Sequence, residues 1–170
     1  MVASAAFAMG LASIAASASA ATRAVSPCTA SVLSAKVTGY GEGMSQPAAY
    51  ITVTNTEAQS CSLKGYPSIT SAATSQGRQA ISVTNGAVMN APESKPRRIV
   101  LAPGEQAWFA VGAGTAFDAP IVTFRRIGFT PAAGAGTLTV RVSLQATAPS
   151  GKPFPLGVTA YAPGSSPSES

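Results

Sequence analysis

The stretch LTVRVSLQ, residues 138 to 145, alternates apolar and polar side chains without a break. One set of alternate positions is apolar and the other is polar: Leu138, Val140, Val142 and Leu144 against Thr139, Arg141, Ser143 and Gln145. Successive side chains of a β-strand point to opposite faces of the sheet, so this period predicts a strand with one face in the core and one in water.

Shorter runs with the same period predict strands elsewhere in the chain. Two are centred on the pairs Ile51 and Val53, and Ile81 and Val83. Further candidate strands cover residues 31–38, 68–73, 121–125 and 157–161. The segment RIVLAPGEQAWFAVG, residues 98 to 112, predicts a hairpin around a type II turn at Pro103-Gly104. Seven or more short strands favour an all-β, two-sheet antiparallel β-sandwich.

The first twenty residues, MVASAAFAMGLASIAASASA, are apolar or small and carry no charge. Ala18-Ser19-Ala20 has the small-x-small form of a signal cleavage site, so we predict an export signal cleaved after Ala20. An uncleaved membrane anchor is the alternative, which the abundance of Ala and Ser and the lack of a basic flank disfavour. The prediction is a secreted or envelope protein with linker 21–27, domain 28–162, flexible tail 163–170 and no transmembrane helix after cleavage.

The chain of 170 residues has only two cysteines, Cys28 and Cys61. Because export leads to an oxidising compartment, we predict that they form one disulfide. Two alternatives are weaker. A lipid-modified cysteine needs a small preceding residue, whereas Pro27 precedes Cys28, and two cysteines without histidine make a poor zinc site.

Three segments together resemble an actinobacterial exported family catalogued as domain of unknown function 4232. They are Cys28, YITVTNTEAQSCSLKGYPSI and LAPGEQAWFAV, within about residues 28 to 146. The motif positions are Asn55, Cys61, Leu63, Gly65, Tyr66, Pro67, Leu101, Pro103, Gly104 and Trp108. The resemblance implies an immunoglobulin-like sandwich in a secreted protein or envelope lipoprotein, and no activity. Many members carry a second cysteine pair, which this chain lacks.

Within this motif, Gly65 is expected to permit a backbone bend, and Tyr66 to bury its ring with its hydroxyl bonded. The alternative is that Tyr66 and Pro67 form a loop that faces a ligand.

The chain has no histidine, which excludes Ser-His-acid and Cys-His catalysis and most catalytic zinc sites. The acids that remain fall in expected loops: Glu42, Glu57, Glu93, Glu105, Asp118 and Glu169. We therefore expect no catalytic residue, no metal and no cofactor. A carboxylate-dependent hydrolase would need two of these acids to converge in a cleft.

The chain has a net charge of +5, and five of its 11 basic residues fall in two short stretches, one with Lys95, Arg97 and Arg98 and one with Arg125 and Arg126. Basic clusters attract anionic polymers, lipid headgroups or nucleic acid, and export makes nucleic acid the least expected partner. The alternative is a solvated surface that keeps the protein soluble.

The burial or exposure of Trp108 tests the binding hypothesis. Because Trp108 alternates with Phe109, its side chain should point away from that of Phe109, either to a ligand surface outside the core or to a face covered by the other sheet. An exposed Trp108 beside Arg125 would favour binding.

The predicted function is an exported, noncatalytic binding module with an anionic envelope polymer as candidate ligand. An accessory protein that binds another exported protein is the alternative, ahead of a hydrolase.

Overall fold

The computed structural model of the protein describes residues 24–41, 47–86, 88–114 and 119–167. Within these ranges the backbone forms β-strands and no α-helix, so the predicted all-β class is confirmed. No described segment forms a helix long and apolar enough to cross a membrane. The predicted signal, residues 1–20 with its cleavage site after Ala20, lies outside the described residues.

The strands follow one another closely along the chain. In order they are β1 (Leu33–Gly41), β2 (Ala48–Asn55), β3 (Cys61–Lys64), β4 (Ser68–Thr74), β5 (Gly77–Gln79), β6 (Ile81–Asn85), β7 (Arg98–Leu101), β8 (Gln106–Ala113), β9 (Ile121–Thr130), β10 (Leu138–Thr147), β11 (Phe154–Val158) and β12 (Ala162–Pro163).

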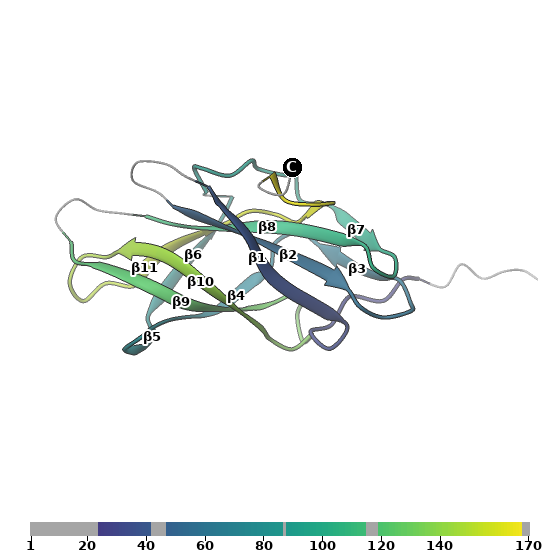
Figure 1. The fold of residues 1–170 in the computed structure, drawn as a ribbon, viewed down its shortest axis with the longest axis horizontal. Coiled ribbons are helices and arrows are strands. Elements are labelled where there is room, and N and C mark those ends of the chain that lie inside the picture. Colours follow the sequence, from purple (N-terminus) through teal and green to yellow (C-terminus); the bar gives the residue numbers. More distant parts are fainter. Residues whose placement is uncertain (1–23, 42–46, 87, 115–118, 168–170) are drawn as a thin grey trace, which may run out of the picture.

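These strands form a β-sandwich of two main sheets (Figure 1). The first sheet has the order β1-β2-β8-β11-β6, with β12 also paired to β8. The second sheet has the order β10-β9-β4-β5, and β3 pairs with β7 in a separate two-stranded ladder. The prediction of an antiparallel sandwich holds with one exception, because β6 and β11 run parallel.

The core lies between the two sheets. Phe109 of β8 packs edge-on against Phe129 of β9, with ring centroids 4.9 Å apart, and against Tyr161 at 5.5 Å. The predicted alternation in β10 is confirmed, with Val140, Val142 and Leu144 buried and Thr139, Arg141, Ser143 and Gln145 exposed. Burial of apolar surface on both inner faces is therefore the main stabilising term of the fold.

Trp108 points away from this core and is nevertheless buried, with 6% of its surface exposed. Its ring lies edge-on to that of Tyr50 at 5.7 Å. The C-terminal strand β12 pairs with β8 at Trp108, and Ser166, 1% exposed, lies 2.9 Å from the Thr38 hydroxyl. The described part of the predicted tail, residues 163–167, follows the edge of β8, where Pro163 lies opposite Ala107 and the Gly164 amide donates to the Gln106 carbonyl at 2.9 Å.

The predicted hairpin at residues 98 to 112 is also wrong, although its turn is correct. Gly104 has φ of 76°, and the Glu105 amide donates to the Ala102 carbonyl at 3.0 Å, as in a type II turn. However, β7 pairs with β3 and β8 pairs with β2. Asn55, at the end of β2, separates β7 from β8. Its main-chain carbonyl accepts from the Gly104 amide at 2.8 Å, and its main-chain amide donates to the Glu105 carbonyl at 3.0 Å.

The predicted disulfide between Cys28 and Cys61 is confirmed. It joins the start of β3 to the segment before β1, whose main chain also bonds to β3. The Cys28 amide donates to the Ser62 carbonyl at 2.9 Å, and the Ser62 amide donates to Ser26 at 2.8 Å. The described part of the predicted linker, residues 24–27, is therefore joined to β3 through Ser26 and through the parallel bridge of Pro27 to Ser62.

Candidate anion-binding site

The predicted basic contacts lie on the surface, on two different parts of the fold. Lys95 and Arg97 are exposed in the segment before β7, and Arg98 begins that strand. Arg125 and Arg126 are exposed on β9 of the second sheet. Trp108, the sixth predicted contact residue, is buried and offers no ligand surface.

The exposed face of the second sheet carries a row of arginines. Arg141 of β10 lies directly opposite Arg126 of β9, Arg126 lies opposite Ala73 of β4, and Ala73 lies opposite Arg78 of β5. Directly opposite residues of an antiparallel pair share one face of the sheet, and all three arginines are exposed. We call Arg78, Arg126 and Arg141 the arginine row; Arg125 is also exposed on β9, next to it in sequence.

Neighbouring strands lie about 4.8 Å apart, so Arg126 and Arg141 are close neighbours and Arg78 follows about 10 Å away, beyond the small Ala73. Like charges directly opposite one another destabilise a sheet. The strands β4, β5, β9 and β10 contain no carboxylate, and the described carboxylates lie in loops at Glu57, Glu93 and Glu105. Among the described residues no side chain pairs with the arginine row, so its three charges have no described counter-charge.

Sequence reasoning found Arg125 and Arg126 but missed Arg78 and Arg141. The alternation at residues 138 to 145 correctly put Arg141 on the solvent face. It gave no sign that β10 pairs with β9, because strand register depends on partners far apart in the chain.

A surface groove of about 630 Å³ lies beside the β3–β7 ladder. Its polar lining comes from Ser62, Lys64, Tyr66, Ser68 and Arg98, and its apolar lining from Val25, Pro27 and the β9–β10 loop at residues 131–133. Gly65, with φ of 69°, makes the predicted bend that leads into Tyr66. Tyr66 is half-buried and packs against the core, and it also forms a wall of the groove. The ring is therefore buried only in part, and its hydroxyl makes no hydrogen bond within the described structure. Of the alternative ligand-facing pair, Tyr66 lines the groove while Pro67 is buried.

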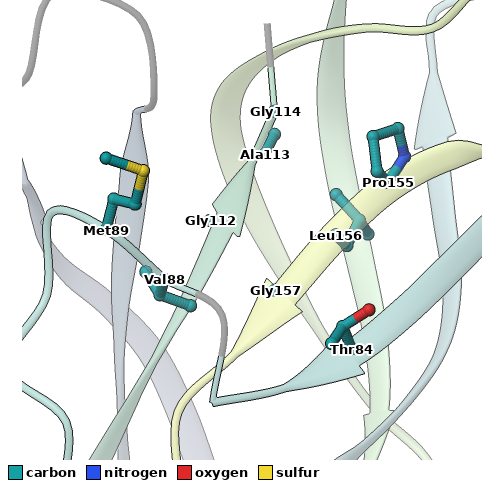
Figure 2. Close-up of a pocket in the computed structure, with 9 residues that line it drawn as sticks. All are labelled: Thr84, Val88, Met89, Gly112, Ala113, Gly114, Pro155, Leu156 and Gly157. Carbon is teal, nitrogen blue, oxygen red and sulfur yellow. The ribbon is translucent and has the colours of Figure 1, made fainter.

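A smaller pocket of about 140 Å³ is lined by residues in or next to β6, β8 and β11 and by Val88 and Met89. Figure 2 shows how these residues lie. Val88 covers the backbone of Gly112, where an added Cβ would lie 2.9 Å from the valine. The lining includes the Thr84 hydroxyl and the exposed Met89 but no titratable side chain. This pocket therefore carries no group for acid–base or nucleophilic chemistry.

The described acids form no paired-carboxylate or metal site in the places where a pocket or cluster could hold one. Glu57 lines a pocket with Gln59 and Cys61, without a second carboxylate. The structure brings no three of the described His, Cys, Asp and Glu residues together as metal ligands. The arginine row and the groove are the two surfaces that concentrate charge without a described counter-charge.

Residues 28–162 match the family described as Domain of unknown function (DUF4232). No curated protein and no solved structure matches the chain. The match covers the sandwich from the first disulfide cysteine to the start of β12.

Proposed function

We propose, for a chain that belongs to the DUF4232 family, that it is an exported, noncatalytic binding module that holds an anionic polymer of the cell envelope on its arginine row. The observation that carries the proposal is the strand register that aligns Arg78, Arg126 and Arg141 on one exposed face without a carboxylate.

The chemistry of arginine favours this assignment. A guanidinium group stays charged at any relevant pH and its planar fork matches carboxylate and phosphate groups. A row of such groups across several strands suits a ligand with several anionic groups rather than a single small anion. An extended anion would also relieve the repulsion between Arg126 and Arg141, which no described carboxylate compensates.

The location supports an envelope ligand. The disulfide Cys28–Cys61 persists in oxidising compartments, which the cytosol is not. Outside the cytoplasm, anionic envelope polymers are available to a protein of net charge +5, while nucleic acid is not the expected partner.

Cosedimentation of the oxidised protein with purified, protein-free bacterial cell walls tests the proposal. We expect binding that weakens as salt rises, because exposed charges are screened over about 10 Å at 0.1 M salt. The double variant R126E/R141E should bind at least about tenfold more weakly, a loss of about 1.4 kcal/mol.

The matched control is K95E/R97E, which makes the same change of charge at two exposed residues outside the second sheet. It should retain most of the binding. Equal losses in both double variants would mean that only net charge matters, and binding no better than that of an inert protein of similar charge would reject the proposal.

A second candidate, an accessory protein for another exported protein, is favoured by one feature. Strand β6 has β11 as its one described strand partner and carries no charged residue, and Val83 on it is 38% exposed. An uncharged open edge is a template for strand addition by a partner. Crosslinking of the exported protein in its native envelope, with V83K as the variant that blocks the edge, distinguishes this role, since V83K should leave polymer binding unchanged.

A further inference from the structure

The groove beside the β3–β7 ladder holds a second pair of like charges. Lys64 of β3 lies directly opposite Arg98 of β7, and both side chains line the groove together with Tyr66. No carboxylate is among the described residues that line it. Neither cation has a described ion-pair partner, although the Glu93 carboxylate lies near the Tyr66 hydroxyl, since both are within 4 Å of the Cβ position of Gly86.

One of these two cations is fixed in place. The Arg98 guanidinium donates to the Val25 carbonyl and to the Ser62 hydroxyl, the latter at 3.2 Å. Both bonds use the same terminal nitrogen, so the other N–H groups of Arg98 remain for a ligand. Fixing a cation in advance lowers the entropic cost of binding an anion there.

The groove and the arginine row are joined by one strip of the second sheet. Ser68 lines the groove and lies opposite Thr130 at the end of β9. From Thr130, the alternate positions of β9 are Gly128 and then Arg126 of the arginine row. At about 3.3 Å per residue, the four steps along the strand from Thr130 to Arg126 span about 13 Å.

This strip carries no charged side chain, and its residues are small or bear hydroxyl groups. Ser71 and Thr139 lie opposite Gly128 on the two neighbouring strands. A Cβ at Gly128 would lie 2.4 Å from the Ser71 hydroxyl oxygen, so only glycine leaves that hydroxyl in position. The strip offers hydrogen-bonding groups to a chain lying on it but no cation.

We propose that the groove and the arginine row bind one extended anionic polysaccharide, which lies along β9 between them. This inference rests on the proposed function and names its ligand class. A polymer with a charge on every short unit, such as polyphosphate or nucleic acid, would leave charges unmatched on the 13 Å strip. A glycan whose anionic groups are separated by hydroxyl-bearing sugars matches it, with a sugar ring against Tyr66 and an anionic group at Lys64 and Arg98.

Titration calorimetry of the oxidised protein with hyaluronan oligosaccharides, from a disaccharide to an octasaccharide, tests the span, because these chains carry a carboxylate only on every second sugar. A parallel series of phosphodiester-linked oligosaccharides shows whether carboxylate or phosphate is the anion. In at least one series we expect the affinity to rise at least about tenfold once the chain reaches both sites. Linear polyphosphate of similar length should bind more weakly than the better series.

The variant K64E removes the groove contact at an exposed residue whose side chain has no described hydrogen bond, and K152E is the matched control on an exposed loop. We expect K64E to reduce the affinity for the octasaccharide to that for the short members, and K152E to have little effect. The inference is wrong if K64E binds long chains as the parent protein does, if length has no effect, or if polyphosphate binds as tightly. The proposed function survives those outcomes as long as R126E/R141E still weakens binding more than K95E/R97E does. It fails if cell walls bind the protein no better than they bind the inert control protein, or if the two double variants lose binding equally.

Discussion

At the scale of single residues, Asn55 organises the corner where three parts of the chain meet. Its side-chain amide donates to the carbonyls of Gln59 and Leu101, at 2.8 and 3.0 Å, and its side-chain oxygen accepts from Glu57 at 3.1 Å. The residue is fully buried. No other side chain of similar size offers two donors and an acceptor in this arrangement.

We therefore expect Asn55→Ala to lower the free energy of unfolding by about 2 to 3 kcal/mol, because buried carbonyl groups would lose their partners. Urea unfolding of the oxidised protein measures this loss. Asn85→Ala, at an exposed position of β6, is the control and should change stability little. A loss no larger than that of the control would show that water replaces the Asn55 bonds.

Tyr161 presents the opposite case, a buried polar group without a described partner. Its hydroxyl has no hydrogen bond within the described structure, and burial raises the pKa of the phenol far above its ordinary value of 10.0. The ring itself packs well, edge-on to Phe109. The buried hydroxyl thus lowers the stability of the fold, and the contacts of the ring offset this loss.

Tyr161→Phe should leave stability unchanged at neutral pH or raise it by about 1 kcal/mol. Because the folded state holds the Tyr161 proton more tightly than the unfolded state, the parent protein should lose stability as the pH rises above 10, the ordinary pKa of the group. The phenylalanine variant lacks this loss, so the difference in unfolding free energy should widen from pH 9 to 11. A clear destabilisation at pH 7 would reveal a hydroxyl partner.

At the scale of elements, the sequence predicted strands better than it predicted their partners. The alternation of β10 and the turn at Pro103-Gly104 follow from local chemistry and were correct. The pairing of β7 with β3 was missed, because local turn chemistry does not say which strand a segment joins. β2 and β8 are buried on both faces. Their sequences therefore lack the polar–apolar alternation that would tell an exposed face from a covered one, and the burial of Trp108 could not be predicted.

The cover over Trp108 yields a prediction about β12. Ending the chain at Tyr161 removes β12 and Ser166, which should expose the indole and shift its fluorescence to longer wavelength. The signal is unambiguous because Trp108 is the only tryptophan in the chain. A chain ending at Pro167 is the control and should keep the parent spectrum. Identical spectra for both truncations would mean that the tail does not protect Trp108 in solution.

At the scale of the whole molecule, the candidate site exists because the pairing register of the strands brings together cations that are far apart in the sequence. Arg125 and Arg126 could be predicted from the sequence because they are adjacent in it. Lys95, Arg97 and Arg98 could be predicted because they lie within one short stretch. Arg78, Arg141 and Lys64 stand alone in the sequence and join these clusters only through strand pairing. Patches assembled from separate strands cannot be recognised until the order of the sheet is known.

If the arginine row is maintained for binding, it should reduce the stability of the fold. Arg126→Thr removes the repulsion with Arg141 and introduces a residue with high strand propensity. We expect a gain of about 0.5 kcal/mol in the free energy of unfolding at low salt. The gain should shrink at 1 M salt, where charges are screened within about 3 Å.

The same variant should bind anionic polymer more weakly, so stability and binding move in opposite directions. Lys152→Thr, an exposed cation in a loop, is the control and should change neither property appreciably. A loss of stability in Arg126→Thr at low salt would show that the arginine side chain contributes packing to the sheet, and the row would then need no ligand to explain it. A gain that disappears with salt, together with weaker binding, would identify the row as a functional surface held at the expense of the fold.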